Sequence, residues 1–254
     1  MIDCHCHLDH PLFDKDRDQV VEAAKTSGIS VIITNGIDPG TNRKSLELAR
    51  RYSIVKAGLG VYPRSAIKHE TEQEGKKYTS FDIGEELGFI TDHKKEVIAI
   101  GEVGLDGVRG IDTPQKKDFE LMIELAEKLK KPIIVHSRKA EAEVLALLET
   151  SKLKVILHAF HGKRRLVQKA IDNGWYFSVS THIARSQEMQ YIAKEAPLSK
   201  LFPETDAPFL SPFPGKRNEP AFVIEAIKKI AEIKGLDMEE TSKNIWKNYQ
   251  KVFV

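Results

Sequence analysis

Side chains that bind metals stand at the ends of several apolar runs in this sequence. His5 and His7 close the first run, in the motif "DCHCH". The same arrangement recurs later in the chain at Glu102, His136, His158 and Asp206. Four imidazoles and two carboxylates suit zinc, manganese or another first-row divalent ion, and they make a poor calcium site. Burying them together is costly unless cations neutralise them, so the pattern indicates a metal site.

The number of these ligands bears on the number of ions. Six ligands exceed what one zinc ion usually takes, whereas two ions that share a bridging carboxylate would use them all. Glu102 is the candidate bridge because it lies between the two groups along the chain. A pair of ions can activate a water molecule and polarise a phosphoryl or carbonyl oxygen, so the set indicates a hydrolase.

Cys4 and Cys6 alternate with the two histidines. Successive side chains of a strand point to opposite faces, so histidines that face a metal leave the cysteines facing the other way. We interpret them as small buried apolar residues. Residues two apart on a strand are poorly placed for a disulfide, so the thiols are predicted to be free and the chain cytoplasmic.

Eight apolar runs alternate with amphipathic stretches and must position these residues. The runs are 1–7, 29–36, 54–63, 97–106, 132–137, 155–160, 175–180 and 201–208. Continuous apolar strands separated by helices indicate a parallel sheet covered on both faces. Eight such units in 254 residues predict an α/β fold, a closed (β/α)8 TIM barrel with the metal site at the C-terminal mouth of its strands.

The absence of linkers, the charge balance and the lack of long apolar segments bear on domain number, nucleic-acid binding and membrane association. No linker divides it, so residues 1–254 are predicted to form a single domain, with 64–85 as an irregular loop at the mouth. Lys and Arg number 39 against 37 Asp and Glu, a net charge of +2 that argues against a nucleic-acid coat. No apolar run approaches the length of a membrane helix and the N-terminus lacks a signal peptide, so we expect no membrane association and no obligate protein partner.

Seven motifs give the chain a resemblance to a known family. They are "DCHCHLD" (3–9), "GEVGLD" (101–106), "IIVHSRKA" (133–140), "LHAFHG" (157–162), "ETDAPFL" (204–210), "RNEP" (217–220) and "NYQKVF" (248–253). In this order they resemble the TatD-type metal-dependent hydrolases, barrel proteins of the amidohydrolase superfamily associated with DNA 3′-exonuclease activity. The resemblance implies two divalent ions (Mg, Mn or Zn) and DNA 3′ ends as a transient substrate.

The resemblance also assigns roles to individual residues. His5 and His7 would bind the first ion, His136 and His158 the second, and Glu102 would bridge them. Asp206 would lie by the first ion and accept the proton of the attacking water, so Glu102 and Asp206 are the catalytic carboxylates. Arg138 and Arg217 are candidates for phosphate contacts, and Glu204 would hold a ligand or loop in place.

Two segments depart from the family pattern. The family usually carries "G-[IV]-H-P-H" after the third strand, whereas this chain has "GVYPR" (60–64), with Tyr62 and Arg64 in place of the histidines. Tyr62 can donate a hydrogen bond to a substrate and Arg64 restores a positive charge, so both are candidate substrate contacts. His161 stands where Ser or Thr is common and competes with His158 as a ligand, and we favour His158 because it ends an apolar strand.

Three functions fit these residues. The first is a two-metal phosphodiesterase, a DNase that removes nucleotides from the 3′ ends of single-stranded or frayed DNA, since a near-neutral chain offers few cations to grip a duplex. The alternative is an amidohydrolase acting on a small cyclic amide, ester or lactone. Many such relatives bridge their ions with a carboxylated lysine, which "GEVG" (101–104) lacks. The least favoured is a non-catalytic barrel binding protein, because all six ligands are present.

Overall fold

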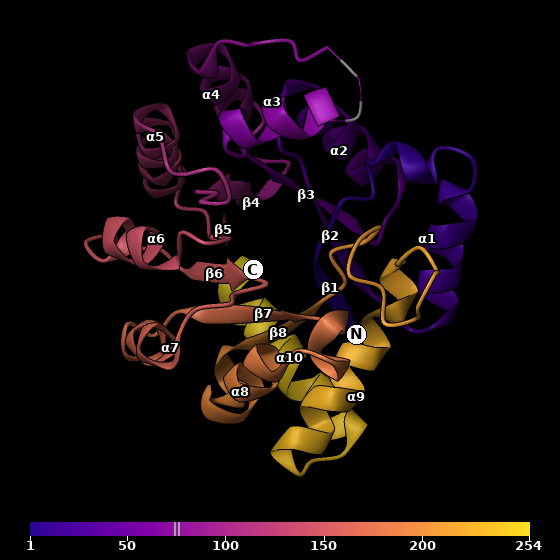
Figure 1. Ribbon diagram of the computed structural model, residues 1–254. Helices are drawn as coiled ribbons and strands as arrows, with labels where there is room; N and C mark the ends of the chain where they lie inside the picture. Colours follow the sequence, from indigo (N-terminus) through magenta and orange to yellow (C-terminus); the bar gives the residue numbers. More distant parts are fainter. Residues whose placement is uncertain (74, 76) are drawn as a thin grey trace.

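Parallel strands, paired in chain order, form the centre of the molecule (Figure 1). The structure is a computed structural model and describes residues 1–73, 75 and 77–254. In these residues the strands are β1 Ile2–Cys6, β2 Val31–Asn35, β3 Val55–Leu59, β4 Val97–Gly104, β5 Ile133–His136, β6 Val155–His158, β7 Tyr176–Ser180 and β8 Leu201–Glu204. Each lies inside one of the predicted apolar runs, and helices follow the strands, so the (β/α)8 TIM barrel is confirmed.

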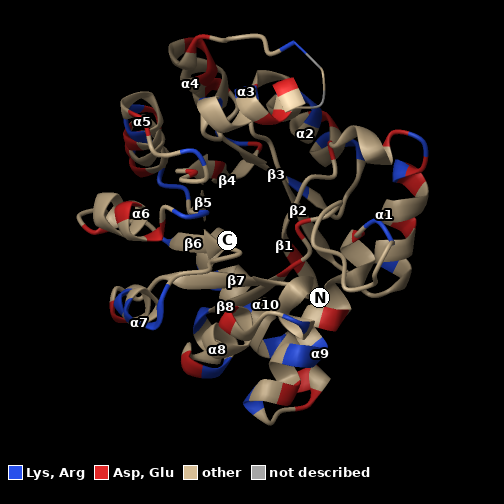
Figure 2. Ribbon diagram, in the orientation of Figure 1, with Lys and Arg blue, Asp and Glu red and all other residues tan. Residues whose placement is uncertain are grey.

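The helices surround the strands (Figure 1). They are α1 Arg17–Thr26, α2 Pro39–Arg51, α3 Arg64–Gln73, α4 Ile83–Asp92, α5 Thr113–Leu129, α6 Glu141–Leu148, α7 Arg164–Asp172, α8 Gln187–Glu195, α9 Val223–Lys234 and α10 Met238–Phe253, with short 3-10 turns at Pro11–Phe13, Thr181–Ala184, Leu198–Lys200 and Pro220–Phe222. Charged residues of both signs lie mainly on these helices and their loops (Figure 2). In the part of the chain that the structure describes, no helix is both long and apolar enough to cross a membrane.

The segment 64–85 was predicted to be irregular, and that prediction was wrong. It contains α3 and the first turn of α4, while residues 74 and 76 lie outside the described residues. The first turn of α3 forms because the Pro63 carbonyl accepts from the amides of Ala66 and Ile67, at 2.9 and 3.1 Å. Within α3 only Ile67 is buried. A helix with so little apolar surface leaves almost no periodic pattern in the sequence.

The barrel closes between its last and first strands through the residues that follow β8. The amide of Asp206 donates to the His5 carbonyl at 2.9 Å, and the amide of His7 donates to the Ala207 carbonyl at 2.7 Å. The buried carboxylate of Asp3 accepts from the backbone and hydroxyl of Thr205, at 2.9 and 2.6 Å. These bonds hold the end of β8 beside the end of β1, which brings Asp206 to the two histidines.

Irregular pairing and a glycine shape two strand ends at the mouth. The register of β1 against β2 shifts between Asp3 and Cys6, and that of β4 against β5 shifts between Ile100 and Val103. Such shifts re-aim side chains, and these two enclose His5 and Glu102. Gly104 has φ +143°, and a Cβ there would lie 2.0 Å from the His136 carbonyl oxygen. Glycine therefore permits the close approach of β4 to β5 at the site.

The alternation predicted for the first strand is present. Cys4 and Cys6 are free, fully buried and part of an apolar cluster that includes Ile33. The Cys6 thiol points at the Ile33 carbonyl oxygen, 3.7 Å away. His5, between the cysteines, instead faces the groups at the mouth, because neighbouring side chains of a strand point to opposite faces.

Candidate metal centre

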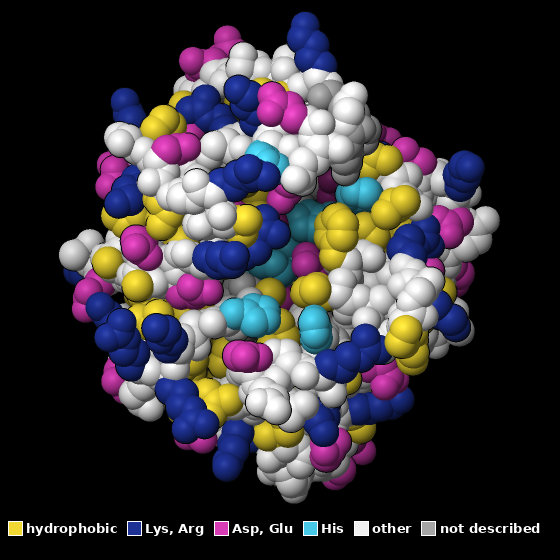
Figure 3. All heavy atoms as spheres, in the orientation of Figure 1, with side chains coloured by type: hydrophobic (Ala, Val, Ile, Leu, Met, Phe, Trp, Pro, Cys, Tyr) yellow, Lys and Arg dark blue, Asp and Glu magenta, His cyan; other side chains and the backbone are white. Residues whose placement is uncertain are grey.

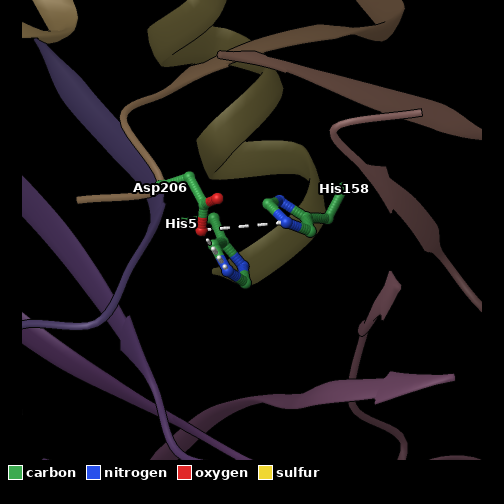
Figure 4. Close-up of side chains that lie close together, drawn as sticks. All are labelled: His5, His158 and Asp206. Atoms are coloured by element: carbon green, nitrogen blue, oxygen red, sulfur yellow. Dashed lines mark ion pairs between the residues drawn. The ribbon is translucent and has the colours of Figure 1, made fainter. Parts of the chain in front are cut away.

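The six predicted ligands converge at the C-terminal mouth of the barrel. A space-filling view into the mouth shows a central hollow with histidine side chains in its floor (Figure 3). His5, His158 and Asp206, from β1, β6 and the loop after β8, point toward one another (Figure 4). Asp206 Oδ1 lies 3.5 Å from His5 Nε2 and 3.8 Å from His158 Nε2. Residues spread over two hundred positions thus meet because strand ends share one face of the barrel.

One group of donor atoms has the spacing of a metal coordination shell. His5 Nε2 and His7 Nε2 are 3.3 Å apart, and both lie 3.5 Å from Asp206 Oδ1. Glu102 Oε2 lies 3.5 Å from the first of these nitrogens and 3.3 Å from the second. Tetrahedral ligand atoms at about 2.1 Å from one ion would be about 3.4 Å apart. The chemistry and spacing of these four side chains therefore fit a divalent ion.

A second group lies beside the first and shares Glu102. Glu102 Oε1 is 3.0 Å from His136 Nδ1, whereas its other oxygen faces His5 and His7. Donor atoms of Glu102, His136 and His158 all lie within 4.8 Å of one another. The rings of His5 and His158 stack with centroids 3.7 Å apart, so the two groups are in contact. This second set also consists of metal-binding side chains.

Three of the four rings are fixed through the nitrogen that points away from the cluster. His7 Nδ1 donates to the Asn35 carbonyl at 3.0 Å, and His158 Nδ1 donates to Glu204 Oε2 at 2.9 Å. His136 Nε2 donates to Asp106 Oδ2 at 3.0 Å. A hydrogen bond of this kind sets the tautomer, so the remaining nitrogen keeps its lone pair for a ligand. The buried Nδ1 of His5 has no such partner among the described residues.

Opposite charges perturb the pKa values of the cluster. Burial opposes the charged form of His158, but Glu204 and Asp206 outweigh it and raise the pKa of this imidazole to about 9. Burial likewise opposes the ionised form of Glu102, but hydrogen bonds from His136, His5 and His7 hold its pKa well below the usual range. Burial lowers the pKa of His5, whereas neighbouring carboxylates outweigh burial and raise the pKa values of His7, His136 and His158. Divalent ions would therefore displace protons from these three imidazoles when they bind.

Arg138 and Tyr62, two of the predicted substrate contacts, adjoin the second group through Asp106. Asp106 Oδ2 accepts from Arg138 Nε at 2.6 Å and from the Tyr62 hydroxyl at 3.2 Å. The same hydroxyl lies 3.1 Å from His136 Nε2, so Tyr62 is buried against a candidate ligand. Arg138 is half exposed and pairs through Nη2 with Glu70 at 3.0 Å.

Arg64 and Arg217, the other two, are held away from the cluster by carboxylates. Arg64 forms a bidentate ion pair with Asp118 of α5, at 2.6 and 2.9 Å. Arg217 pairs with Asp16 at 2.7 and 2.9 Å and with Glu219 at 3.0 Å. Neither guanidinium contacts one of the six ligands in the described contacts.

Of the two remaining predicted residues, Glu204 adjoins the cluster and His161 does not. Besides His158, Glu204 binds the backbone, since its Oε1 accepts from the Ala159 amide at 3.1 Å. His161 is exposed, and its Nδ1 donates to the Ala159 carbonyl at 2.6 Å. The structure therefore brings His158 into the cluster and leaves His161 at the surface.

Asp106 is the residue that the sequence reading missed. It was quoted within "GEVGLD" without a role, yet it contacts His136, Arg138 and Tyr62. Its place two residues beyond the end of β4 was the available signal. A cavity of about 390 Å³ opens beside it and is lined also by Arg109, Gln115 and Arg138. The cavity and the metal cluster thus share the wall that Asp106 forms.

Comparison with known proteins agrees with this geometry. The model of the family described as TatD related DNase matches residues 2–254. The chain belongs to the TatD family. Deoxyribonuclease TATDN3 of Homo sapiens is 35% identical over 261 residues, covering 100% of this chain and 94% of the human protein. The 3′-5′ ssDNA/RNA exonuclease TatD of Salmonella typhimurium is 33% identical over 251 residues, covering 93% of this chain and 92% of that protein.

A solved structure of the TatD family matches the fold. The crystal structure of YJJV, a TatD homolog from Escherichia coli, superposes with a TM-score of 0.87 at 24% sequence identity. The match covers 100% of this chain and 97% of the YJJV chain. At this identity the likeness supports the barrel architecture alone.

Proposed function

We propose that this chain is a two-metal-dependent phosphodiester hydrolase that removes nucleotides from the 3′ ends of single-stranded or frayed DNA. The TatD family membership and the nuclease names of its relatives support a metal-dependent hydrolase acting on ester bonds. The finer statements, which are the number of ions, the polarity and the strand preference, are our proposal. The cytoplasmic location expected from the free cysteines also stays a prediction.

The observation that carries the proposal is the placement of Glu102 between two groups of ligands. Its Oε2 faces His5 and His7, and its Oε1 faces His136. A carboxylate with one oxygen toward each group is suited to bridge two cations. A single ion would leave part of the buried charge of these side chains without a nearby opposite charge. His158 and Asp206 would complete the two ligand sets.

Bound divalent ions would polarise the phosphoryl oxygen and lower the pKa of the attacking water. Asp206 would accept the proton of that water. Burial opposes ionisation of Asp206, but His158, His7 and His5 keep its pKa below the usual value, so it is a carboxylate at neutral pH. An ionised carboxylate within reach of the water is what a general base requires.

Arg138 is the basic residue best placed to bind the phosphate. Its Nε is fixed by Asp106, while its Nη2 donates to the half-exposed Glu70. A substrate phosphate can replace Glu70 as the partner of this guanidinium, because a phosphodiester, like a carboxylate, offers a pair of oxygens that share a negative charge. Arg64 and Arg217 stay predictions, and each would first have to leave its carboxylate.

The proposal is tested with 5′-labelled DNA, single-stranded and blunt duplex, incubated with Mg²⁺, Mn²⁺ or Zn²⁺. We expect stepwise shortening from the 3′ end that needs the ion and is faster on the single strand. Glu102→Gln should abolish shortening, whereas Glu96→Gln, at a surface ion pair with Arg50, should not. Absence of metal-dependent shortening would refute the proposal. Hydrolysis of a cyclic amide or lactone instead would favour the alternative.

A further inference from the structure

Phe209 presents a large aromatic ring at the rim of the metal centre. It lies three residues after Asp206, and its side chain is 49% exposed. Its ring centroid is 6.3 Å from that of His7, at an interplanar angle of 64°, and 5.5 Å from that of His10. A planar apolar surface open to solvent therefore stands beside a candidate metal ligand.

The backbone holds this ring in a fixed place. The amide of Phe209 donates to the Asp206 carbonyl at 2.8 Å, and its carbonyl accepts from Asn218 Nδ2 at 2.7 Å. Asn218 is fully buried and also binds the Thr205 carbonyl at 2.8 Å. The next carbonyl, of Leu210, accepts from the Thr181 hydroxyl at 2.8 Å. An exposed ring on a fixed backbone loses little conformational freedom when a ligand binds to it.

The side of the metal centre next to His136 is polar and carries arginines instead of an exposed aromatic ring. There His136 contacts Asp106, which forms the wall of the cavity that Arg109 and Arg138 line. The metal centre is thus flanked by guanidinium groups on one side and by the ring of Phe209 on the other. Proteins that bind single strands combine cationic groups, which follow the backbone, with aromatic rings, on which bases stack.

We propose that Phe209 is a stacking platform for a nucleobase, namely the base of a nucleotide that flanks the phosphate being cleaved. This inference rests on the proposed function and adds a specificity-determining residue to it. Every base has a π-face, so the platform accepts all four bases without reading sequence. A paired base is already stacked inside a duplex, so Phe209 favours an unpaired or frayed end.

The experiment uses single-stranded oligonucleotides with 2-aminopurine at the terminal or the penultimate 3′ position, since stacking quenches its fluorescence. Phosphorothioate linkages at the 3′ end keep the strand intact during a titration with protein and Mg²⁺, because Mg²⁺ binds sulfur poorly. Phe209→Ala removes the platform and Phe209→Trp retains it. The matched control is Phe213→Ala, because Phe213 is similarly exposed on the same loop but packs edge-to-face on Phe222, with centroids 5.0 Å apart.

We expect the wild-type protein, Phe209→Trp and Phe213→Ala to quench the probe at one of the two positions. Phe209→Ala should lose that quenching and bind the strand more weakly, by roughly fivefold to 150-fold. For a strand that carries only the sugar at that position, Phe209→Ala and wild type should bind alike. Equal melting temperatures would show that all variants are folded.

Two outcomes overturn the inference, and they differ in meaning. If wild type shortens DNA and Phe209→Ala quenches and binds as wild type does, the stacking role is refuted while the proposed function stands. If wild type neither binds nor shortens any strand with any of the three ions, the proposed function fails and the stacking role fails with it.

Discussion

Asp106→Asn should loosen His136 without altering the shape of the site. The carboxylate of Asp106 accepts through one oxygen from His136 and Arg138, at 3.0 and 2.6 Å, and through the other from the Val108 amide at 3.0 Å. Asparagine has the same size but a single acceptor oxygen and no charge. The Tyr62 hydroxyl also donates to the first of these oxygens, at 3.2 Å. One uncharged oxygen cannot replace both carboxylate oxygens for these four donors, so the hydrogen bond that sets the tautomer of His136 is weakened or lost.

The expected size of the effect follows from what remains in place. Asp106→Asn leaves His136, His158 and Glu102 present as ligands and removes only the group that orients one of them. Loss of such a supporting group costs about 10- to 100-fold in metal affinity. This corresponds to about 1.4–2.7 kcal/mol. The first group of ligands, at His5 and His7, does not contact Asp106 and should keep its affinity.

The assay is a titration of the chelated protein with Mn²⁺, followed by electron paramagnetic resonance, which counts free ions. Wild type should show two sites, and Asp106→Asn should weaken one of them. Asp118→Asn is the matched control, because Asp118 is also a buried carboxylate that binds an arginine, Arg64, but no histidine. If folded Asp106→Asn binds both ions as tightly as wild type, Asp106 does not orient a ligand and our reasoning is wrong.

Four further predictions concern the metal site and the first strand. Glu204→Gln removes the charge and one of the two oxygens that accept from His158 Nδ1 and the Ala159 amide, and it should weaken Mn²⁺ binding by about 10- to 100-fold in the same titration. With a pKa of about 9, His158 carries a proton at pH 7 that an ion must displace, so calorimetry in different buffers should show proton release at pH 7 and less above pH 9. In the chelated protein, this proton's contribution to the free energy of unfolding should be complete below pH 6.5 and lost as pH rises through about 9. Cys4→Ala with Cys6→Ala should leave metal content unchanged, as measured by mass spectrometry, and a loss of metal from the folded variant would contradict this prediction.

The barrel could be predicted because buried parallel strands must be continuous apolar runs. The run 155–160, for example, contains β6, and the polar residue that ends the strand is His158. Since all strand ends share one face, the sequence also predicted which side chains would meet. It did not predict α3, where Ile67 alone is buried and most of the helix surface is polar.

The contacts of the charged residues could not be predicted, because their partners are distant in sequence. Arg217 pairs with Asp16, 201 positions away, and Arg64 pairs with Asp118, 54 positions away. Asp106 was overlooked because a carboxylate after a strand has the same sequence signature as a helix N-cap. Asp112, six residues later, is such a cap and accepts from the Gln115 amide at 2.8 Å.

The most direct test of the account is anomalous diffraction from a crystal of this protein soaked with Mn²⁺. We predict two anomalous peaks at the mouth, one bonded to His5 and His7 and the other to His136 and His158, with Glu102 bonded to both. A single peak, or two peaks of which Glu102 touches only one, would contradict the bridging role on which the proposed function depends.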